Sequence, residues 1–289
     1  MPPSPTPRIQ TNMTSAPTNY TQGYSKATTS SHASRTAQSD AVFLLPHLRP
    51  TSSILDIGCG PATITIGLAA TVPNGSVTAV ELTDEILAQA RENISSVKPT
   101  PPTNITLVKA DLLAGLPFKD GMFDVVFASQ LFPHLRAEEV GVQALREMRR
   151  VVKEGGIVVT RDAAELHFYP RSYELDRLWA GSMARVLGGS EGGRFPGGEM
   201  PGLYRRAGFD REKMVVGAGT TVYSGERERR WFAEGCLGRL TEGDEFRGSW
   251  VRARITEEEI EETKEALRAW MEDQDAWYVA VQTEILAWK

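Results

Sequence analysis

Closely spaced glycines follow an acidic residue at Ile54–Ala62, whose sequence is ILDIGCGPA, and this segment is the one best suited to bind a ligand. Glycine lacks a Cβ, so Gly58 and Gly60 let backbone N–H groups approach a bound molecule closely. Because Thr63 stands where the G-x-G-x-x-G pattern needs a small residue, the spacing disfavours a nicotinamide-type Rossmann site. The segment therefore predicts a small-molecule site of another kind at the end of a strand.

Two acidic residues narrow the chemistry of that ligand. Asp56 stands two residues before the first glycine, and Glu81 ends the next apolar run. A carboxylate at the first position would repel a pyrophosphate but would attract a ligand that carries an ammonium and a sulfonium. An acid at the second position can bind both hydroxyls of a ribose. S-adenosylmethionine has all of these groups, so the two residues predict this cofactor.

The elements that must position these residues alternate along the chain. Apolar runs predict buried strands, and amphipathic or capped segments predict the helices between them. Strands are predicted at Ser53–Ile57, Val77–Val80, Ile105–Val108, Phe123–Ala128 and Ile157–Thr160, and helices at residues 40–48, at Thr63–Thr71, after the cap Thr83, and at Ala137–Val151. This order predicts an α/β fold, doubly wound around a parallel sheet.

The rest of the chain is predicted to complete a single domain over residues 19–289, after a disordered N-terminus at 1–18 that is rich in Pro, Ser and Thr. Within the domain, residues 40–163 form the cofactor-binding core, residues 165–210 a lid or substrate cap, and residues 211–289 late strands and helices. The lid aromatics Phe168, Tyr173 and Trp179 are predicted as lid core in preference to a substrate cage. Strands at Lys213–Tyr223 and Trp277–Trp288, with helices near 226–240 and 256–273 between them, predict an antiparallel hairpin at the sheet edge.

Composition excludes several classes of partner. The net charge of −5 gives no basic surplus for nucleic acid, and two cysteines in 289 residues allow neither a disulfide framework nor a zinc cluster. A magnesium-dependent catechol enzyme would need a carboxylate cluster near strands four and five, where only Asp162 stands, so no metal is expected. The chain has no secretory signal and no apolar run of membrane-spanning length, so a cytoplasmic protein without a membrane span is predicted.

Four stretches in this order resemble the class I S-adenosylmethionine-dependent methyltransferases: LDIGCG, VTAVELTDEILAQAR, KADLLAGLPFKDGMFDVVFASQLFPHL and ALREMRRVVKEGGIVVT. The likeness covers about Tyr20–Arg161. It is strongest to the branch that contains the ubiquinone/menaquinone C-methyltransferases and many fungal natural-product methyltransferases. It implies a Rossmann-like sheet of seven strands with one antiparallel strand near the edge, an N-terminal arm and a helical lid insertion.

The resemblance also implies where the cofactor binds. Its methionine part would lie over the loop that holds Asp56, Gly58, Gly60 and Ala62, with Cys59 packed behind the loop. This sequence departs from the family at Ala62, where a third glycine is usual, and at Glu81, where Asp is common. A methyl group at residue 62 could crowd the ligand and lower its affinity.

Further cofactor contacts follow by position. Glu81 would hold the ribose with Leu82 against the adenine face, and Asp111 would meet the adenine amino group with Leu112 beside it. The alternative role for Asp111, purely structural, is that of a helix N-cap. The contacts nearest the sulfonium and the methionine amine would be those of Ser129 and Gln130, and the arm residue covering the cofactor would be Tyr20 or Tyr24.

The predicted reaction is methyl transfer to a small, apolar organic acceptor in secondary metabolism, with S-adenosylhomocysteine as the product. His134 follows strand four and is the leading general base, although a surface or capping role is as compatible with its position. His167 and Tyr169, taken to lie just past strand five on the same rim, are the reserves. O-, N- and C-methylation all remain open. The alternative is a methyltransferase-fold protein that keeps the cofactor but catalyses a cyclisation or pericyclic rearrangement.

Overall fold

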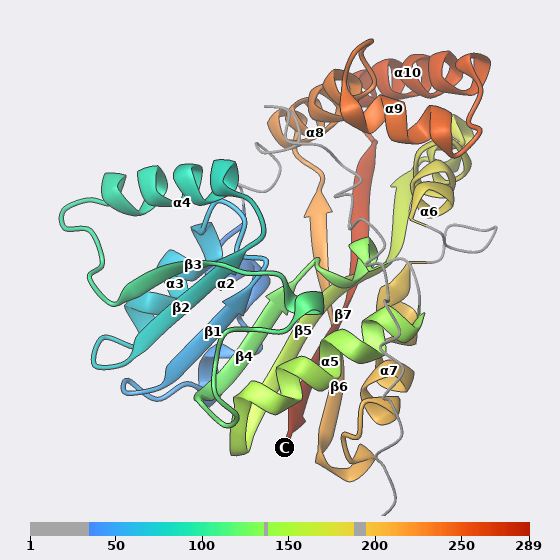
Figure 1. The fold of residues 1–289 in the computed structure, drawn as a ribbon. Helices are drawn as coiled ribbons and strands as arrows, with labels where there is room; N and C mark the ends of the chain where they lie inside the picture. Colours follow the sequence, from blue (N-terminus) through green and yellow to red (C-terminus); the bar gives the residue numbers. More distant parts are fainter. Residues whose placement is uncertain (1–34, 136–137, 188–194) are drawn as a thin grey trace, which may run out of the picture.

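The computed structural model describes residues 35–135, 138–187 and 195–289, and its centre is a seven-stranded sheet (Figure 1). The strand order is β3-β2-β1-β4-β5-β7-β6. Every neighbouring pair from β3 to β5 is parallel, whereas β7 runs antiparallel to both β5 and β6. The predicted sheet with one antiparallel strand near its edge is thus confirmed. The strands are β1 (Ser53–Ile57), β2 (Ser76–Glu81), β3 (Ile105–Lys109), β4 (Phe123–Ser129), β5 (Val152–Tyr169), β6 (Met214–Tyr223) and β7 (Trp277–Trp288).

Helices cover both faces of this sheet. One face packs an apolar cluster with α2 (Ala37–Asp40) and α3 (Thr63–Thr71), and α4 (Asp84–Ser96) lies beside α3. The other face packs against α5 (Glu138–Val151) and α7 (Met200–Arg206). The remaining helices form a layer beyond one end of the sheet: α6 (Ser182–Val186), α8 (Glu226–Arg239), α9 (Glu245–Arg252) and α10 (Glu257–Glu272). In the described part of the chain, no helix combines the length and apolarity needed to cross a membrane.

The structure differs from the prediction at two helices. The helix predicted at residues 40–48 is replaced by α2, which starts at the cap Thr36, and by a short 3₁₀ turn at Leu45–His47. Pro46 in that turn has no N–H to donate, so an α-helix cannot run through it. Helix α9 was not predicted, because Gly248 lies inside its sequence and Gly243 stands just before its cap. The N-terminal disorder predicted at 1–18, and the arm residues Tyr20 and Tyr24, lie outside the described residues.

Strand β5 is much longer than the predicted Ile157–Thr160. It continues to Tyr169, and beyond Arg161 it pairs only with β7, because β4 ends at Ser129 opposite Arg161. Residues 165–169, assigned by sequence to the lid, are therefore strand. The other residues predicted as lid divide between the two sides: α6 joins the helical layer, and α7 packs on α5.

A second hydrophobic core lies between the extended ends of the strands and the helical layer. It is rich in buried aromatic rings, among them Phe168, Trp179, Phe246, Trp250, Trp270 and Tyr278. Phe168 and Trp179 are 1% and 3% exposed, so they belong to the core and do not line a cage, as predicted. Tyr173 is anchored at the edge of this core, where its hydroxyl donates to Asp273 Oδ2 at 2.9 Å.

Candidate functional site

The glycine segment forms a tight turn between β1 and α3. Gly58, Gly60 and Ala62 have φ values of 67°, 54° and 64°, in the left-handed region that favours glycine. The backbone N–H groups of Gly58 and Cys59 both donate to the carbonyl of Val80, at 2.9 and 3.1 Å, which ties the turn to the end of β2. A Cβ added to Gly60 would meet nothing within 4 Å, so the turn is open there, as a cradle for a ligand requires.

Glu81 joins this turn from the end of β2. Its Oε2 accepts from the N–H of Gly60 at 3.2 Å, and its Oε1 accepts from the N–H of Leu82 at 2.7 Å. Burial raises the pKa of the carboxyl group, and these two backbone bonds partly offset that rise. Each carboxylate oxygen has a second lone pair, so the group can still accept from two hydroxyls of a ligand.

Asp56 lies beneath the turn and is 3% exposed. Thr65, in the first turn of α3, donates its Oγ1 hydroxyl to Asp56 Oδ2 at 2.6 Å. Burial, reinforced by the charge of Glu81, raises the pKa of Asp56 to about 6. Burial and the two carboxylates also raise the pKa of the Cys59 thiol, which stays protonated and is a packing residue, not a nucleophile.

The raised pKa of Asp56 predicts a pH-dependent stability. The folded protein binds the Asp56 proton more tightly than the unfolded chain does. This group therefore stabilises the fold fully below about pH 4, and the stabilisation is lost as the pH rises through 6. A pKa near 6, against about 3.9 in the unfolded chain, corresponds to roughly 3 kcal/mol. Asp56→Asn, in which the Thr65 hydroxyl can accept in place of donating, is expected to be more stable than wild type at pH 8 by about this amount.

Urea unfolding of both proteins between pH 4 and 8 measures this difference. It should widen as pH rises from 4 to 7. A difference that stays constant with pH would show that ionised Asp56 is not disfavoured in the fold. Asp120→Asn, which changes a carboxylate whose side chain is 79% exposed, is the control and should show little effect.

The end of β4 borders the same turn. A Cβ built on Gly58 would lie 3.4 Å from Leu131 Cδ1, so this leucine packs against the glycine turn. Ser129 has its Oγ buried with no hydrogen-bond partner among the residues the structure describes. Gln130 has a positive φ of 56°; its N–H donates to the Arg161 carbonyl at 2.8 Å, and its Nε2 donates to Gln282 Oε1 at 2.6 Å.

Asp111 follows β3 and caps a 3₁₀ turn. Its Oδ1 accepts from the N–H of Leu113 at 2.8 Å, so the alternative capping role from sequence is present. The cap uses one of the two carboxyl oxygens, so it does not exclude a ligand contact through the other. Leu112 is buried beside Asp111. In the glycine turn, Ala62 is fully buried, so its methyl group lies inside the protein and not on the surface of that turn.

These residues fit S-adenosylmethionine. The carboxylates of Asp56 and Glu81 match a cationic ligand that also carries a ribose, and the turn is open at Gly60. The buried Ser129 Oγ has no partner within residues 35–135, 138–187 and 195–289. The comparisons agree with this fit. Residues 54–156 match the family of methyltransferase domains. The "Probable methyltransferase ltbC" of Aspergillus luteorubrus is 42% identical over 277 residues, which cover 94% of this chain and 97% of that protein.

The chain belongs to the class I S-adenosylmethionine-dependent methyltransferases. This methyltransferase is also 29% identical over 197 residues to the demethylmenaquinone methyltransferase of Desulfitobacterium hafniense, over 63% of the chain and 76% of that protein. Its fold is similar to that of the YcgJ protein of Bacillus subtilis, with a TM-score of 0.54 and 16% identity over 86% of this chain and 97% of that one.

Of the three predicted catalytic residues, the methyltransferase places only His134 near the cofactor turn. His134 ends the 3₁₀ turn Phe132–His134, directly after β4. His167 and Tyr169 lie within β5, not past it, and six and eight residues beyond Arg161 place them about 20 and 26 Å along the strand. They do not share the rim with His134, because β5 continues along β7 after β4 has ended.

Both distant residues already have partners. His167 Nδ1 is 2.7 Å from Asp176 Oδ2, and its Nε2 is 2.9 Å from Glu165 Oε2. The ring of Tyr169 stacks on Trp277 with centroids 4.4 Å apart. These contacts tie the far ends of β5 and β7 to each other and to the helical layer.

Two buried charged groups in the middle of β5, where its pairing with β4 ends, were missed as functional residues. Arg161 is 2% exposed and pairs with Asp40 at 2.8 Å and Glu284 at 3.1 Å. Asp162 is fully buried, and it accepts from the N–H of Phe132 at 3.0 Å. The available signal for Asp162 was an acid two residues after the predicted strand end at Thr160. From the sequence, Asp162 was considered only as a metal ligand. No group of His, Cys, Asp and Glu in the described ranges is arranged to hold a metal ion.

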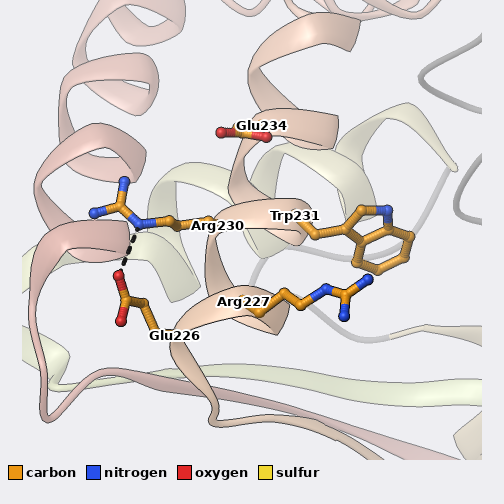
Figure 2. Close-up of a pocket in the computed structure, with 5 residues that line it drawn as sticks. All are labelled: Glu226, Arg227, Arg230, Trp231 and Glu234. Atoms are coloured by element: carbon orange, nitrogen blue, oxygen red, sulfur yellow. Dashed lines mark hydrogen bonds and ion pairs between the residues drawn. The ribbon is translucent and has the colours of Figure 1, made fainter.

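A surface hollow elsewhere in the methyltransferase lies on α8 (Figure 2). Two of its charged side chains are paired: Arg230 donates to Glu226 Oε1 at 3.3 Å on its own helix and to Glu272 Oε1 at 2.6 Å on α10. None of the predicted site residues lines it. Its lining is Glu226, Arg227, Arg230, Trp231 and Glu234, which form a solvated helix face.

Proposed function

We propose that the protein transfers the methyl group of S-adenosylmethionine to a small organic acceptor with a largely apolar body, in secondary metabolism. The observation that carries this proposal is the meeting of the glycine turn with the segment after β4. Leu131 packs against Gly58, and Leu131 and Leu135 are partly buried apolar side chains on either side of His134. An acceptor at this edge would meet apolar surface and a single imidazole.

The relatives support an acceptor of this class. One of them is named as acting on demethylmenaquinone, a small organic molecule. The aromatic residues of the predicted lid do not support an apolar acceptor. Phe168 and Trp179 are buried in the second core and cannot form an acceptor wall. The apolar character of the acceptor therefore rests on the leucines beside His134.

The chemistry divides between the cofactor and the chain. When bound, the cofactor supplies an already activated methyl group. Glu81 binds its ribose, Asp56 lies beneath the turn and stabilises positive charge, and Ser129 with Gln130 orients the methionine end. The residues after β4 hold the acceptor in line with the methyl group, and such alignment supplies several kcal/mol. His134 takes the proton from a hydroxyl or carbon acid; an amine acceptor loses its proton beforehand and needs no base.

The test is a turnover experiment with matched product analysis. The purified protein, S-adenosylmethionine and panels of phenols, quinols and hydrophobic amines are incubated, and S-adenosylhomocysteine and methylated product are quantified together. Equal amounts of both are expected, and neither should form with Glu81→Ala. Conversion of an acceptor without S-adenosylhomocysteine would contradict the proposal and support a cyclisation or pericyclic reaction instead.

A further inference from the structure

Asp162 is a buried carboxyl group in the middle of β5, at the point where the neighbouring strand β4 ends. It directly follows Arg161, which pairs with the last residue of β4, and it is fully buried. Its Oδ1 accepts from the N–H of Phe132 at 3.0 Å, and its Oδ2 has no hydrogen-bond partner among the described residues. Burying a carboxyl group with one oxygen unpaired is unfavourable, so its presence calls for a reason beyond packing.

The partner of Oδ1 belongs to the turn that carries His134. Inside that turn, the N–H of His134 donates to the Leu131 carbonyl and that of Leu135 donates to the Phe132 carbonyl, both at 3.0 Å. The first N–H groups of a helical turn have no acceptor inside it. Those of Phe132 and Leu131 are directed at Asp162 instead. The carboxyl group thus caps the turn from a neighbouring strand.

The compartment around Asp162 is closed. A Cβ on Gly197 would lie 2.4 Å from the carbonyl oxygens of both Asp162 and Ala163, so the segment before α7 lies directly against this part of β5. On the same side, Tyr204 of α7 donates its hydroxyl to Thr160 Oγ1 at 3.2 Å. Bulk water is thus kept away from the Asp162 carboxyl group, which meets the turn directly.

Three charged or titratable groups act on this carboxyl group from the elements around it: Arg161 on its own strand, Arg35 before α2 and Tyr204 on α7. Burial raises the pKa of Asp162 to about 7, while the backbone bonds and the two arginines act in the opposite direction. The ionised form, which is the better acceptor for the Phe132 N–H, is therefore populated at neutral pH.

We propose that Asp162 is a positioning residue for methyl transfer: by capping the turn Phe132–His134 it fixes the His134 imidazole at the edge where acceptor and cofactor meet. The proposal deepens the proposed function and rests on it for the role of His134. Asp162 itself acts through the turn and touches no reacting group.

Nuclear magnetic resonance on the full chain tests this without an acceptor. The chain has four histidines, so the His134 ring signal can be assigned by its loss in His134→Gln. In Asp162→Ala, exchange of the Phe132 amide hydrogen should accelerate by at least about tenfold, as expected when a bond to a charged acceptor is lost. The His134 ring signal and its titration should shift, while those of His47 and His167 stay unchanged.

Two variants serve as controls. Asp162→Asn keeps an acceptor oxygen and should restore protection of the Phe132 amide. Asp210→Ala removes a carboxylate that caps another 3₁₀ turn, at Arg211–Lys213, and should leave His134 unaffected. Calorimetry with S-adenosylhomocysteine should give Asp162→Ala an affinity close to that of wild type.

Unchanged Phe132 exchange and an unchanged His134 signal in Asp162→Ala would overturn the proposal, as would equal shifts of all assigned histidines. If Asp162→Ala does not fold, the Asn variant decides: protection of Phe132 supports the capping role, and its loss contradicts it. Failure of the proposed function is separate, because it would appear as absent S-adenosylhomocysteine formation while these spectra still behaved as expected.

Discussion

Replacing Glu81 with alanine is expected to weaken the binding of S-adenosylmethionine by at least about a hundredfold, since each hydrogen bond to a charged acceptor contributes roughly 1.5–3 kcal/mol. The carboxylate is predicted to accept from two ribose hydroxyls. It also holds the N–H groups of Gly60 and Leu82, at 3.2 and 2.7 Å, so its loss releases the turn as well. Titration calorimetry with S-adenosylmethionine and S-adenosylhomocysteine measures the effect, with NAD as the ligand control.

Glu85→Ala provides the matched control. Glu85 is an exposed acid in the first turn of α4, four residues along the chain, and its removal should leave the affinity within about twofold, as for other exposed charges. If Glu81→Ala binds both sulfur ligands as wild type does, the carboxylate does not hold the ribose. Wild-type protein that binds neither ligand would contradict the cofactor site itself.

Replacing Arg161 with methionine is expected to lower the free energy of unfolding by about 3–5 kcal/mol, the usual cost of removing one partner from a buried ion pair. The guanidinium is 2% exposed and lies between Asp40 of α2 and Glu284 of β7. Without it, the buried carboxylate of Asp40 and the largely buried one of Glu284 both lose their cation. Urea unfolding at pH 7.5 measures the loss.

The control for this prediction is a pair of the same type whose arginine is exposed. Arg49 is 73% exposed and lies 3.3 Å from Asp124, so Arg49→Met should cost less than about 1 kcal/mol. Adding Asp40→Asn to Arg161→Met should recover part of the stability, because one fewer buried charge is left. Equal losses in the two methionine variants would mean that the buried cluster contributes no more than a surface pair.

The sheet could be predicted where local pattern decides the structure. The bounds of β1, α3 and β7 match the sequence prediction because each is a run bounded by strong turn or capping residues. Thr256 and Glu259 form a capping box at the start of α10, where the sequence predicts a helix near 256–273. Features that depend on a distant partner were not predictable in this way. The end of β5 depends on β7, more than a hundred residues later, and no local signal in Glu165–Tyr169 indicates it.

The same distinction holds for the site. Gly58, Gly60 and Glu81 come together as predicted, because carboxyl ends of neighbouring parallel strands meet at one edge. His167 was placed at that edge only because β5 was predicted to stop early. Asp162 is adjacent in sequence to the predicted strand end, but its burial depends on Phe132 and Gly197, which come from separate segments.

The length of β5 and β7 has a consequence for how the molecule moves. Both strands run from the sheet into the helical layer, and each contributes side chains to the cores at both ends, such as Val158 and Phe168 in β5 and Ile285 and Tyr278 in β7. The paired backbone of β5 and β7, which contains a β-bulge at Ala163–Glu165, connects the two cores, so we expect sheet and helical layer to unfold as one cooperative unit. Admission of the acceptor is then expected to involve local loop motion, and not a rigid swing of the helices.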